Sequence, residues 1–211
     1  MSSIVFTMDV SRPYTAVCPT LDGDVLRVLA GTDLGLTGRE VATMAGRSQK
    51  GVLDSLHRLT AHGLVTRVSL NRAYLFTLNR HHLAADAVEL LMAMRGKLFE
   101  RIEEVVYDWD IAAVHASVFG STARGDGNLD SDIDMLIVHP AGASGSGRWE
   151  AQVDKLRDQL EAWTGNRANI VERSEAQVAD LVREKRPIVD ELRTDAIVVA
   201  GLRIKELLEP Q

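Results

Sequence analysis

The stretch AAVHASVFGSTARGDGNLDSDIDMLIV, residues 112–138, decides the fold of the C-terminal half of the chain. An apolar run ends at Phe119, and a short, largely polar segment leads to Asp132 and Asp134 at the head of a second apolar run. Side chains at positions i and i+2 of a strand project from the same face. The two carboxylates can therefore converge on one hard cation, and Mg²⁺ takes one or two protein carboxylates together with substrate phosphates.

Gly120 and Ser121 supply the other half of such a site. A glycine lets the backbone come close to a phosphate, and the serine offers both a hydroxyl and an N–H. A helix that begins here would direct its N-terminus at the anion. A metal beside a phosphate cradle indicates phosphoryl or nucleotidyl transfer. The alternative interpretation is a turn-rich loop whose Asp residues act as caps.

The run GSTARGDGNLDSDIDMLIV resembles the signature of the DNA polymerase β-like nucleotidyltransferase superfamily, and specifically its small minimal nucleotidyltransferases. Their pattern is Gly-Ser, ten residues, then Asp-x-Asp, which is more specific than a lone glycine-rich loop. The clear resemblance covers about residues 112–138, and a looser one extends to about residue 208. The positions that match are Gly120, Ser121, Asp132 and Asp134, with Arg124 where the family commonly has an arginine.

The resemblance implies transfer of a nucleoside monophosphate from an NTP, expected to be ATP, to a hydroxyl acceptor. Asp132 and Asp134 would hold Mg²⁺. Gly120 and Ser121 would bind the phosphates of the nucleotide, and Arg124 would neutralise them.

One position departs from the family pattern. The superfamily carries a third carboxylate on a later strand, and the corresponding segment here, residues 165–172, has Asn169 at that position. An amide can still coordinate a metal but cannot accept a proton at neutral pH. Glu172 lies three residues further on and would point to the opposite face of a strand. If this assignment is wrong, Asp126 or Asp130 is the alternative third carboxylate.

Composition sets broad limits. The chain has 211 residues, of which 45% are hydrophobic and 26% charged, as in ordinary globular proteins. It has no apolar run close to the ~20 residues that cross a bilayer, and residues 1–10 do not read as a secretion signal. The single cysteine, Cys18, excludes an internal disulfide. We therefore expect a cytoplasmic protein without a membrane partner.

The net charge of −6 is unevenly distributed. Residues 35–80 contain seven Lys and Arg against Glu40 and Asp54, a net +5 that leaves −11 for the remainder. A basic module on an acidic body is typical of a nucleic-acid-binding appendage.

The same region has the element order of a winged helix-turn-helix. Helices are predicted over residues 21–29, 38–45 and 49–62, with Thr37 and Ser48 as N-caps, followed by a β-hairpin over residues 64–78. This order resembles the winged-helix family over about residues 20–80. In that geometry the helix after the turn enters the major groove of DNA. The expected contacts to duplex DNA are Arg47, Ser48, Gln49, Lys50, Arg58 and Arg72. The alternative is a protein-interaction or dimerisation module.

The predicted organisation has three parts. Residues 1–82 form a winged helix-turn-helix DNA-binding domain, residues 83–110 a linker helix, and residues 111–211 a nucleotidyltransferase domain. An apolar stripe at three- and four-residue steps predicts one long helix from residue 84 to about residue 107. The expected fold class is α+β, with a small mixed β-sheet flanked by helices in the C-terminal domain.

Two functions remain open at this point. The first is a Mg²⁺-dependent nucleotidyltransferase coupled to a DNA-binding winged helix, which we prefer because the metal and phosphate positions are complete. The second is a catalytically impaired transcriptional regulator or antitoxin in which Asn169 has removed catalysis. Minimal nucleotidyltransferases often act in toxin–antitoxin pairs, so the expected partners include a cognate toxin and a second copy of the chain.

Overall fold

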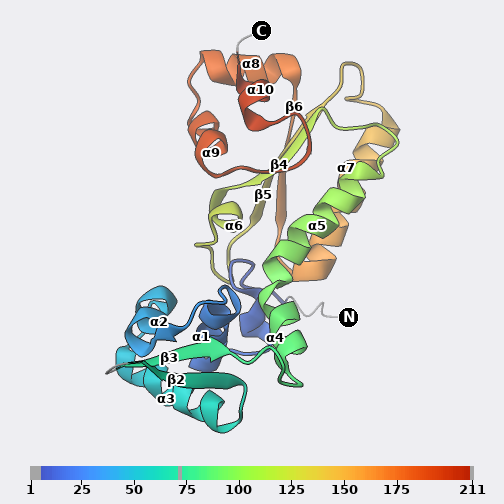
Figure 1. The fold of residues 1–211 in the computed structure, drawn as a ribbon. Coiled ribbons are helices and arrows are strands. Elements are labelled where there is room, and N and C mark those ends of the chain that lie inside the picture. The colour runs from blue at the N-terminus through green and yellow to red at the C-terminus, as the bar shows by residue number, and fades with distance from the viewer. Residues whose placement is uncertain (1–5, 71–72, 210–211) are drawn as a thin grey trace. The chain divides into compact units, whose positions relative to one another are not determined.

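The computed structural model describes residues 6–70 and 73–209, and the chain divides into two compact units (Figure 1). One unit comprises residues 13–94, and the other comprises residues 1–12 together with 95–211. The first unit contains η1 (Pro13–Ala16), α1 (Leu21–Ala30), β1 (Leu36–Thr37), α2 (Gly38–Ala45), α3 (Gln49–Ala61), β2 (Val65–Leu70), β3 (Ala73–Leu78) and α4 (Ala85–Met92). The second contains α5 (Met94–Tyr107, whose first residue closes the other unit), β4 (His115–Phe119), α6 (Gly120–Arg124), β5 (Ile133–His139), α7 (Gly147–Thr164), β6 (Ala168–Ser174), α8 (Glu175–Arg183), α9 (Pro187–Asp195), β7 (Ile197–Gly201) and α10 (Ile204–Leu208).

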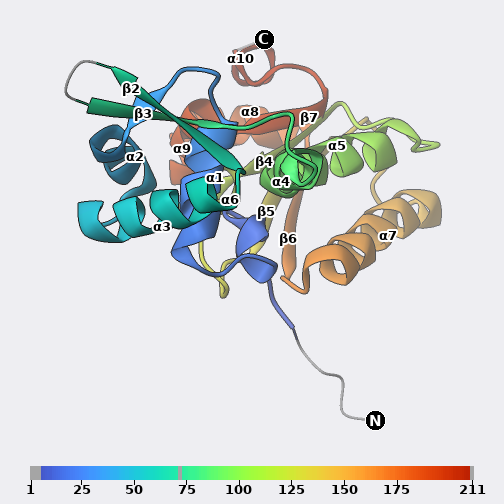
Figure 2. The same cartoon turned by 60° about the horizontal axis from the view of Figure 1, so that its bottom comes forward.

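The unit of residues 13–94 is a winged helix-turn-helix. Its helices and strands follow the expected order, and β1, β3 and β2 form an antiparallel sheet in that order. Strands β2 and β3 lie side by side in Figure 2. Helix α2 begins with a capping box between Thr37 and Glu40, and the side chain of Ser48 caps α3 by accepting a hydrogen bond from the N–H of Gly51. Gly46 ends α2 in the left-handed conformation that suits glycine.

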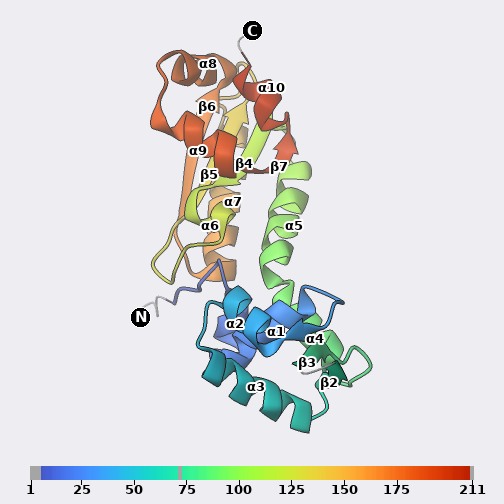
Figure 3. The same ribbon diagram turned by 60° about the vertical axis from the view of Figure 1, so that its left-hand side comes forward.

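The other unit is built on one mixed sheet. Its strand order is β6-β5-β4-β7, with β5 and β6 parallel and the remaining pairs antiparallel. Helices α5 and α7 cover one face, and α8, α9 and α10 cover the other (Figures 1 and 3). Two buried clusters result, one on each face of the sheet. The predicted α+β class with a small mixed sheet is confirmed.

The prediction of one helix from residue 84 to residue 107 is wrong. The structure has two helices, α4 and α5, which belong almost entirely to different units. Val88 of α4 packs in the core of the winged-helix unit, whereas Leu98, Ile102 and Val106 of α5 pack against the mixed sheet. The apolar residues that form one stripe in the sequence therefore pack in two separate cores.

The division between the units also differs from the expected boundaries at residues 82 and 110. Helix α5 is part of the second unit's core and not a linker. The segment before residue 13 belongs to that unit as well. Val10 is buried in its core, and the Met8 N–H donates to Asn166 Oδ1 at 3.0 Å. Both differences arise from contacts between residues far apart in the sequence.

Among the described residues, no helix has the length and apolar character that a membrane span requires.

Candidate functional site

The register of two neighbouring strands builds the candidate site. Strands β5 and β6 are parallel, and Asp134 lies directly opposite Asn169. Further along the same face, Leu136 and Val138 are buried in the cluster beneath α8, α9 and α10. Asp134 itself is only half-buried and Asn169 is exposed. The polar pair therefore lies at the end of the sheet face that these helices leave open.

Three of the predicted residues are in close contact. Asn169 Nδ2 donates to Asp134 Oδ1 at 2.9 Å. On the other side, Gly120 has φ +69°, and a Cβ added there would lie 2.9 Å from Asp134 Oδ2. Both the backbone conformation and the close approach require a residue without a side chain. The Asp134 carboxylate is thus held between a strand amide and the backbone where α6 begins.

The backbone of Asp132 is hydrogen-bonded to α6. Thr122, which is buried, donates its hydroxyl to the Asp132 carbonyl oxygen at 3.2 Å. The Asp132 side chain is exposed, and Ser121 is half-buried on the first turn of α6. Within the described residues, no group of three or more Asp, Glu, His or Cys side chains could hold a metal. Any metal here would therefore rely on two carboxylates and on ligands from a substrate.

Arg124 lies at the other end of α6 from Gly120. It forms ion pairs with Asp195 at 2.7 Å and with Asp126 at 3.0 Å. The hydrogen bonds to Asp195 and Asp126 raise the pKa of the guanidinium further above its ordinary value. In this conformation Arg124 is compensated by two carboxylates, which argues against the predicted role of neutralising phosphates and for a role in fixing α6 to α9.

Glu172 faces away from the candidate site. Its Oε2 accepts a hydrogen bond from Trp149 Nε1 of α7 at 2.7 Å. This contact is on the opposite face of the sheet from Asp134, in agreement with the three-residue spacing from Asn169. Glu172 therefore does not replace the missing carboxylate. Of the alternatives in the loop, Asp126 is paired with Arg124, and Asp130 is exposed.

The predicted DNA-contacting residues are in the winged-helix unit. Ser48, Gln49 and Lys50 are exposed at the start of α3. Arg47 pairs with Asp24 at 2.7 Å, and Arg58 pairs with Asp22, both partners being in α1. Arg72 lies outside the described residues.

These ion pairs change the interpretation of the charge. The window of residues 35–80 leaves out acidic residues that fold into the same unit, among them Asp22 and Asp24. Over residues 13–94 there are eight Lys and Arg against seven Asp and Glu, a net +1. The unit as a whole is nearly neutral, so its net charge does not by itself indicate a DNA-binding surface.

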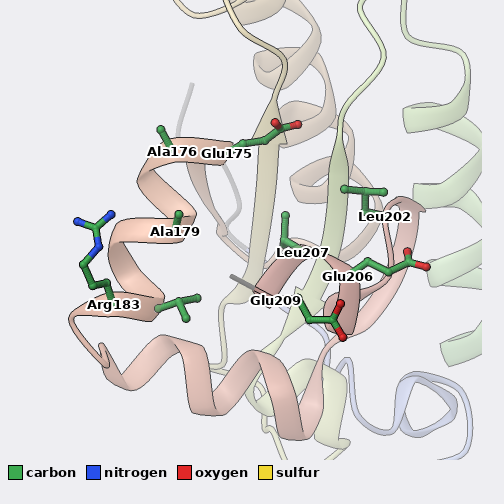
Figure 4. Close-up of a pocket in the computed structure, with 9 residues that line it drawn as sticks. Glu175, Ala176, Ala179, Arg183, Leu202, Glu206, Leu207 and Glu209 are labelled. Carbon is green, nitrogen blue, oxygen red and sulfur yellow. The ribbon is translucent and has the colours of Figure 1, made fainter. Parts of the chain in front are cut away.

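A cavity of about 520 Å³ opens between α8 and α10, away from the candidate site (Figure 4). Its lining includes alanine and leucine side chains together with Glu175, Glu206 and Glu209. None of the predicted site residues lines it. We assign it no part in the chemistry.

Three residues that lie in α6 or contact it were missed by sequence reasoning. Arg95 donates from Nη2 to the carbonyl oxygens of Thr122 and Ala123 at 3.0 and 2.6 Å. Asp195 accepts a hydrogen bond from Arg124, which lies 71 residues earlier in the chain. Thr122 lies inside the quoted motif and could have been considered for its hydroxyl, whereas no local signal identifies Arg95 or Asp195.

Comparison with known proteins agrees with this geometry in one part of the chain. Residues 100–196 match the family model of the nucleotidyltransferase domain. The match begins within α5 and includes Gly120, Ser121, Asp132, Asp134 and Asn169. Over this stretch the match supports the resemblance that the sequence motif indicated, and it includes residues 100–107 of α5. No curated protein matches the chain.

Solved structures give distant similarities. A toxin–antitoxin structure with AMP-PNP has 16% identity and a TM-score of 0.36, over 52% of this chain and 80% of that one. A MarR-family transcriptional regulator from Rhodococcus sp. RHA1 has 20% identity and a TM-score of 0.32, over 43% of this chain and 69% of that one. MepR, a transcription regulator of the Staphylococcus aureus multidrug efflux pump MepA, has 18% identity and a TM-score of 0.33, over 46% of this chain and 73% of that one.

Proposed function

We propose that the unit containing the nucleotidyltransferase domain transfers a nucleoside monophosphate from an NTP, with ATP as the expected donor, to a hydroxyl acceptor. One observation carries the proposal. The start of α6 lies close to the Asp134 carboxylate, because Gly120 has φ +69° and a Cβ added to it would lie 2.9 Å from Asp134 Oδ2. A phosphate bound at Gly120 and Ser121 would therefore lie next to a carboxylate that can share a cation with it.

The residues present fit a Mg²⁺ ion. Asp132 and Asp134 offer carboxylate oxygens, which are the hard ligands that Mg²⁺ prefers, and two carboxylates suffice when substrate phosphates complete the coordination. Bound Mg²⁺ would neutralise charge on the triphosphate and on the leaving pyrophosphate. Asn169 leaves this arrangement possible, because its single N–H contact occupies one of several lone-pair directions of Asp134.

The chain's own groups divide the remaining work. Gly120 would let the backbone approach the phosphate, and Ser121 would donate its N–H or hydroxyl to a phosphate oxygen. Asn169 would hold the Asp134 carboxylate in one orientation. Asp132 and Asp134 would be engaged as metal ligands and the Asn169 amide cannot accept a proton, so the proton of the attacking hydroxyl would pass to solvent or to the substrate. We accordingly expect slow turnover.

The second candidate function is a regulator or antitoxin that binds Mg²⁺–NTP without transferring it. The amide at Asn169 supports it, because the superfamily has a proton acceptor there. Exposed Gln49 and Lys50 at the start of α3 would contact duplex DNA. Since Arg47 and Arg58 are paired within the unit, we expect weaker DNA binding than the charge of residues 35–80 suggested. In this proposal the protein also binds a cognate toxin, forms a homodimer and is located in the cytoplasm.

A transfer assay separates the two functions. The full chain is incubated with Mg²⁺ and each of the four NTPs labelled on the α-phosphate, alone and with candidate acceptor proteins and RNAs. Label that becomes covalently attached to an acceptor, with release of pyrophosphate, supports the enzyme. Binding of Mg²⁺–NTP without transfer to any acceptor supports the regulator, and absence of binding to every NTP contradicts both.

A further inference from the structure

Helix α6 is too short to be stable by itself. It has five residues, Gly120–Arg124, whereas isolated helices shorter than about 12–15 residues are marginal in water. Its conformation must therefore be maintained by contacts with the rest of the unit. Since Gly120 and Ser121 form its first turn, whatever holds α6 also sets where these residues lie.

The C-terminal end of α6 is held by one arginine from α5. The last carbonyl oxygens of a helix have no partners within it. In α6, the Ser121 carbonyl accepts from the N–H groups of Gly125 and Asp126 at 2.9 and 3.3 Å. The next two carbonyls, of Thr122 and Ala123, both accept from Nη2 of Arg95.

Arg95 is in a position that α5 alone does not favour. It lies in the first turn of α5, where a cation opposes the helix dipole. Among the described residues it has no carboxylate partner within ion-pair distance. Its Nε is buried without a hydrogen-bond partner in the described part of the chain, and its guanidinium lies 5.1 Å from the centre of the Phe99 ring. Burial lowers its pKa. The compensation comes from the carbonyl end of α6, where a cation is favourable.

We propose that Arg95 is a positioning residue for nucleotide binding: it fixes the carbonyl end of α6 and thereby holds Gly120 and Ser121 at the phosphate. This inference rests on the proposed nucleotide site, but the state of α6 can be measured without nucleotide. Arg124 fixes the same helix through its side chain and Asp195, whereas Arg95 acts on the backbone.

The test uses the full chain and three variants. Arg95→Met retains an apolar stem without donors, and Arg95→Lys retains the charge. Arg101→Met is the matched control, because Arg101 is on the same helix but lies 5.7 Å from the Trp163 ring centre, away from α6. Hydrogen exchange is followed at the amides of Gly125 and Asp126 without nucleotide, and the Kd for Mg²⁺–ATP is measured separately.

For Arg95→Met we expect exchange at these two amides to accelerate by about tenfold or more, since hydrogen bonds to a charged donor are lost. The Kd for Mg²⁺–ATP should rise by about tenfold or more. Arg95→Lys should recover part of both effects, and Arg101→Met should show neither. If Arg95→Met does not fold, Arg95→Lys decides by the same measurements, with smaller increases expected.

Unchanged exchange at Gly125 and Asp126 would overturn the proposal. Faster exchange with an unchanged Kd would also overturn it, because Arg95 would then stabilise α6 without positioning the nucleotide site. If the wild-type protein binds no NTP, the proposed function fails together with the nucleotide part of this inference, while the exchange data still decide whether Arg95 holds α6.

Discussion

Replacing Asn169 with aspartate tests the candidate site through its best-defined contact. Asn169 Nδ2 donates to Asp134 Oδ1 at 2.9 Å, and Asn169→Asp would replace that donor with a carboxylate oxygen. A hydrogen bond becomes a repulsion between two anions. Two unit charges about 4 Å apart repel by ~1 kcal/mol in bulk water and by ~4 kcal/mol near a protein surface.

Because Asn169 is exposed and Asp134 half-buried, we expect the metal-free variant to lose about 1–4 kcal/mol of unfolding free energy. For a chain of this length each kcal/mol lowers Tm by roughly 2–4 °C. Mg²⁺ should reverse much of the loss, since a cation between the carboxylates removes the repulsion. Thermal unfolding of both proteins, with and without Mg²⁺, measures this difference.

The same substitution should raise turnover. A carboxylate at position 169 would add a proton acceptor, and general-base help is typically worth ~10²–10⁴-fold. Asn128→Asp is the charge control, because it adds one negative charge while its oxygen can still accept from the Asp130 N–H. If Asn169→Asp and Asn128→Asp respond alike to Mg²⁺ and neither changes turnover, the assignment of position 169 to the site is refuted.

Three further results are expected. Gly120→Ala should destabilise the protein more than Gly142→Ala, because only at Gly120 would the added Cβ lie close to another group, the Asp134 carboxylate. Both glycines have positive φ (69° and 78°), so both variants share a backbone strain of about 1–2 kcal/mol. His115, buried and with its pKa lowered from 6.5 by desolvation, should make stability fall as pH drops below about 6.5, and His115→Gln should flatten that fall in thermal unfolding. Lys50→Ala should weaken binding to duplex DNA and reduce the salt slope by about 0.9.

Equal destabilisation by the two glycine variants would show that the site has room for a Cβ at Gly120. The exposed His81→Gln is the control for acid stability, and equal slopes for His81→Gln and His115→Gln would contradict the assignment to the buried imidazole. Lys97→Ala removes an exposed lysine from the other unit, so an equal loss of DNA affinity would show that the start of α3 is not the contact surface.

Local chemistry made much of the fold predictable. The capping box of Thr37 and Glu40 and the cap at Ser48 are short-range hydrogen bonds, so these helix starts could be predicted from neighbouring residues. The Asp-x-Asp spacing at the head of an apolar run predicted both carboxylates on one strand face, but β5 begins at Ile133, so Asp132 lies one residue before the strand. That face carries Asp134 in the structure, opposite Asn169.

What could not be predicted depends on pairs distant in the sequence. Arg47 and Arg58 form ion pairs with residues of α1, which lies outside the basic stretch of residues 35–80. The junction of α4 and α5 has the periodicity of one helix, although its apolar residues enter two cores. The contact of Arg95 with α6 spans 27 residues. In each case the partner is selected by tertiary packing, which no local pattern encodes.

Binding of Mg²⁺–ATP by wild type and by Asp132→Ala/Asp134→Ala is the most direct test of the proposed site. Isothermal titration of the full chain is carried out with and without Mg²⁺, and Asp158→Ala/Asp180→Ala, which removes the same charge from α7 and α8, is the control. We expect Mg²⁺-dependent ATP binding by wild type and by the control, and its loss in Asp132→Ala/Asp134→Ala with the thermal unfolding transition retained. Unchanged Mg²⁺–ATP affinity in Asp132→Ala/Asp134→Ala would contradict the assignment of the metal and nucleotide site.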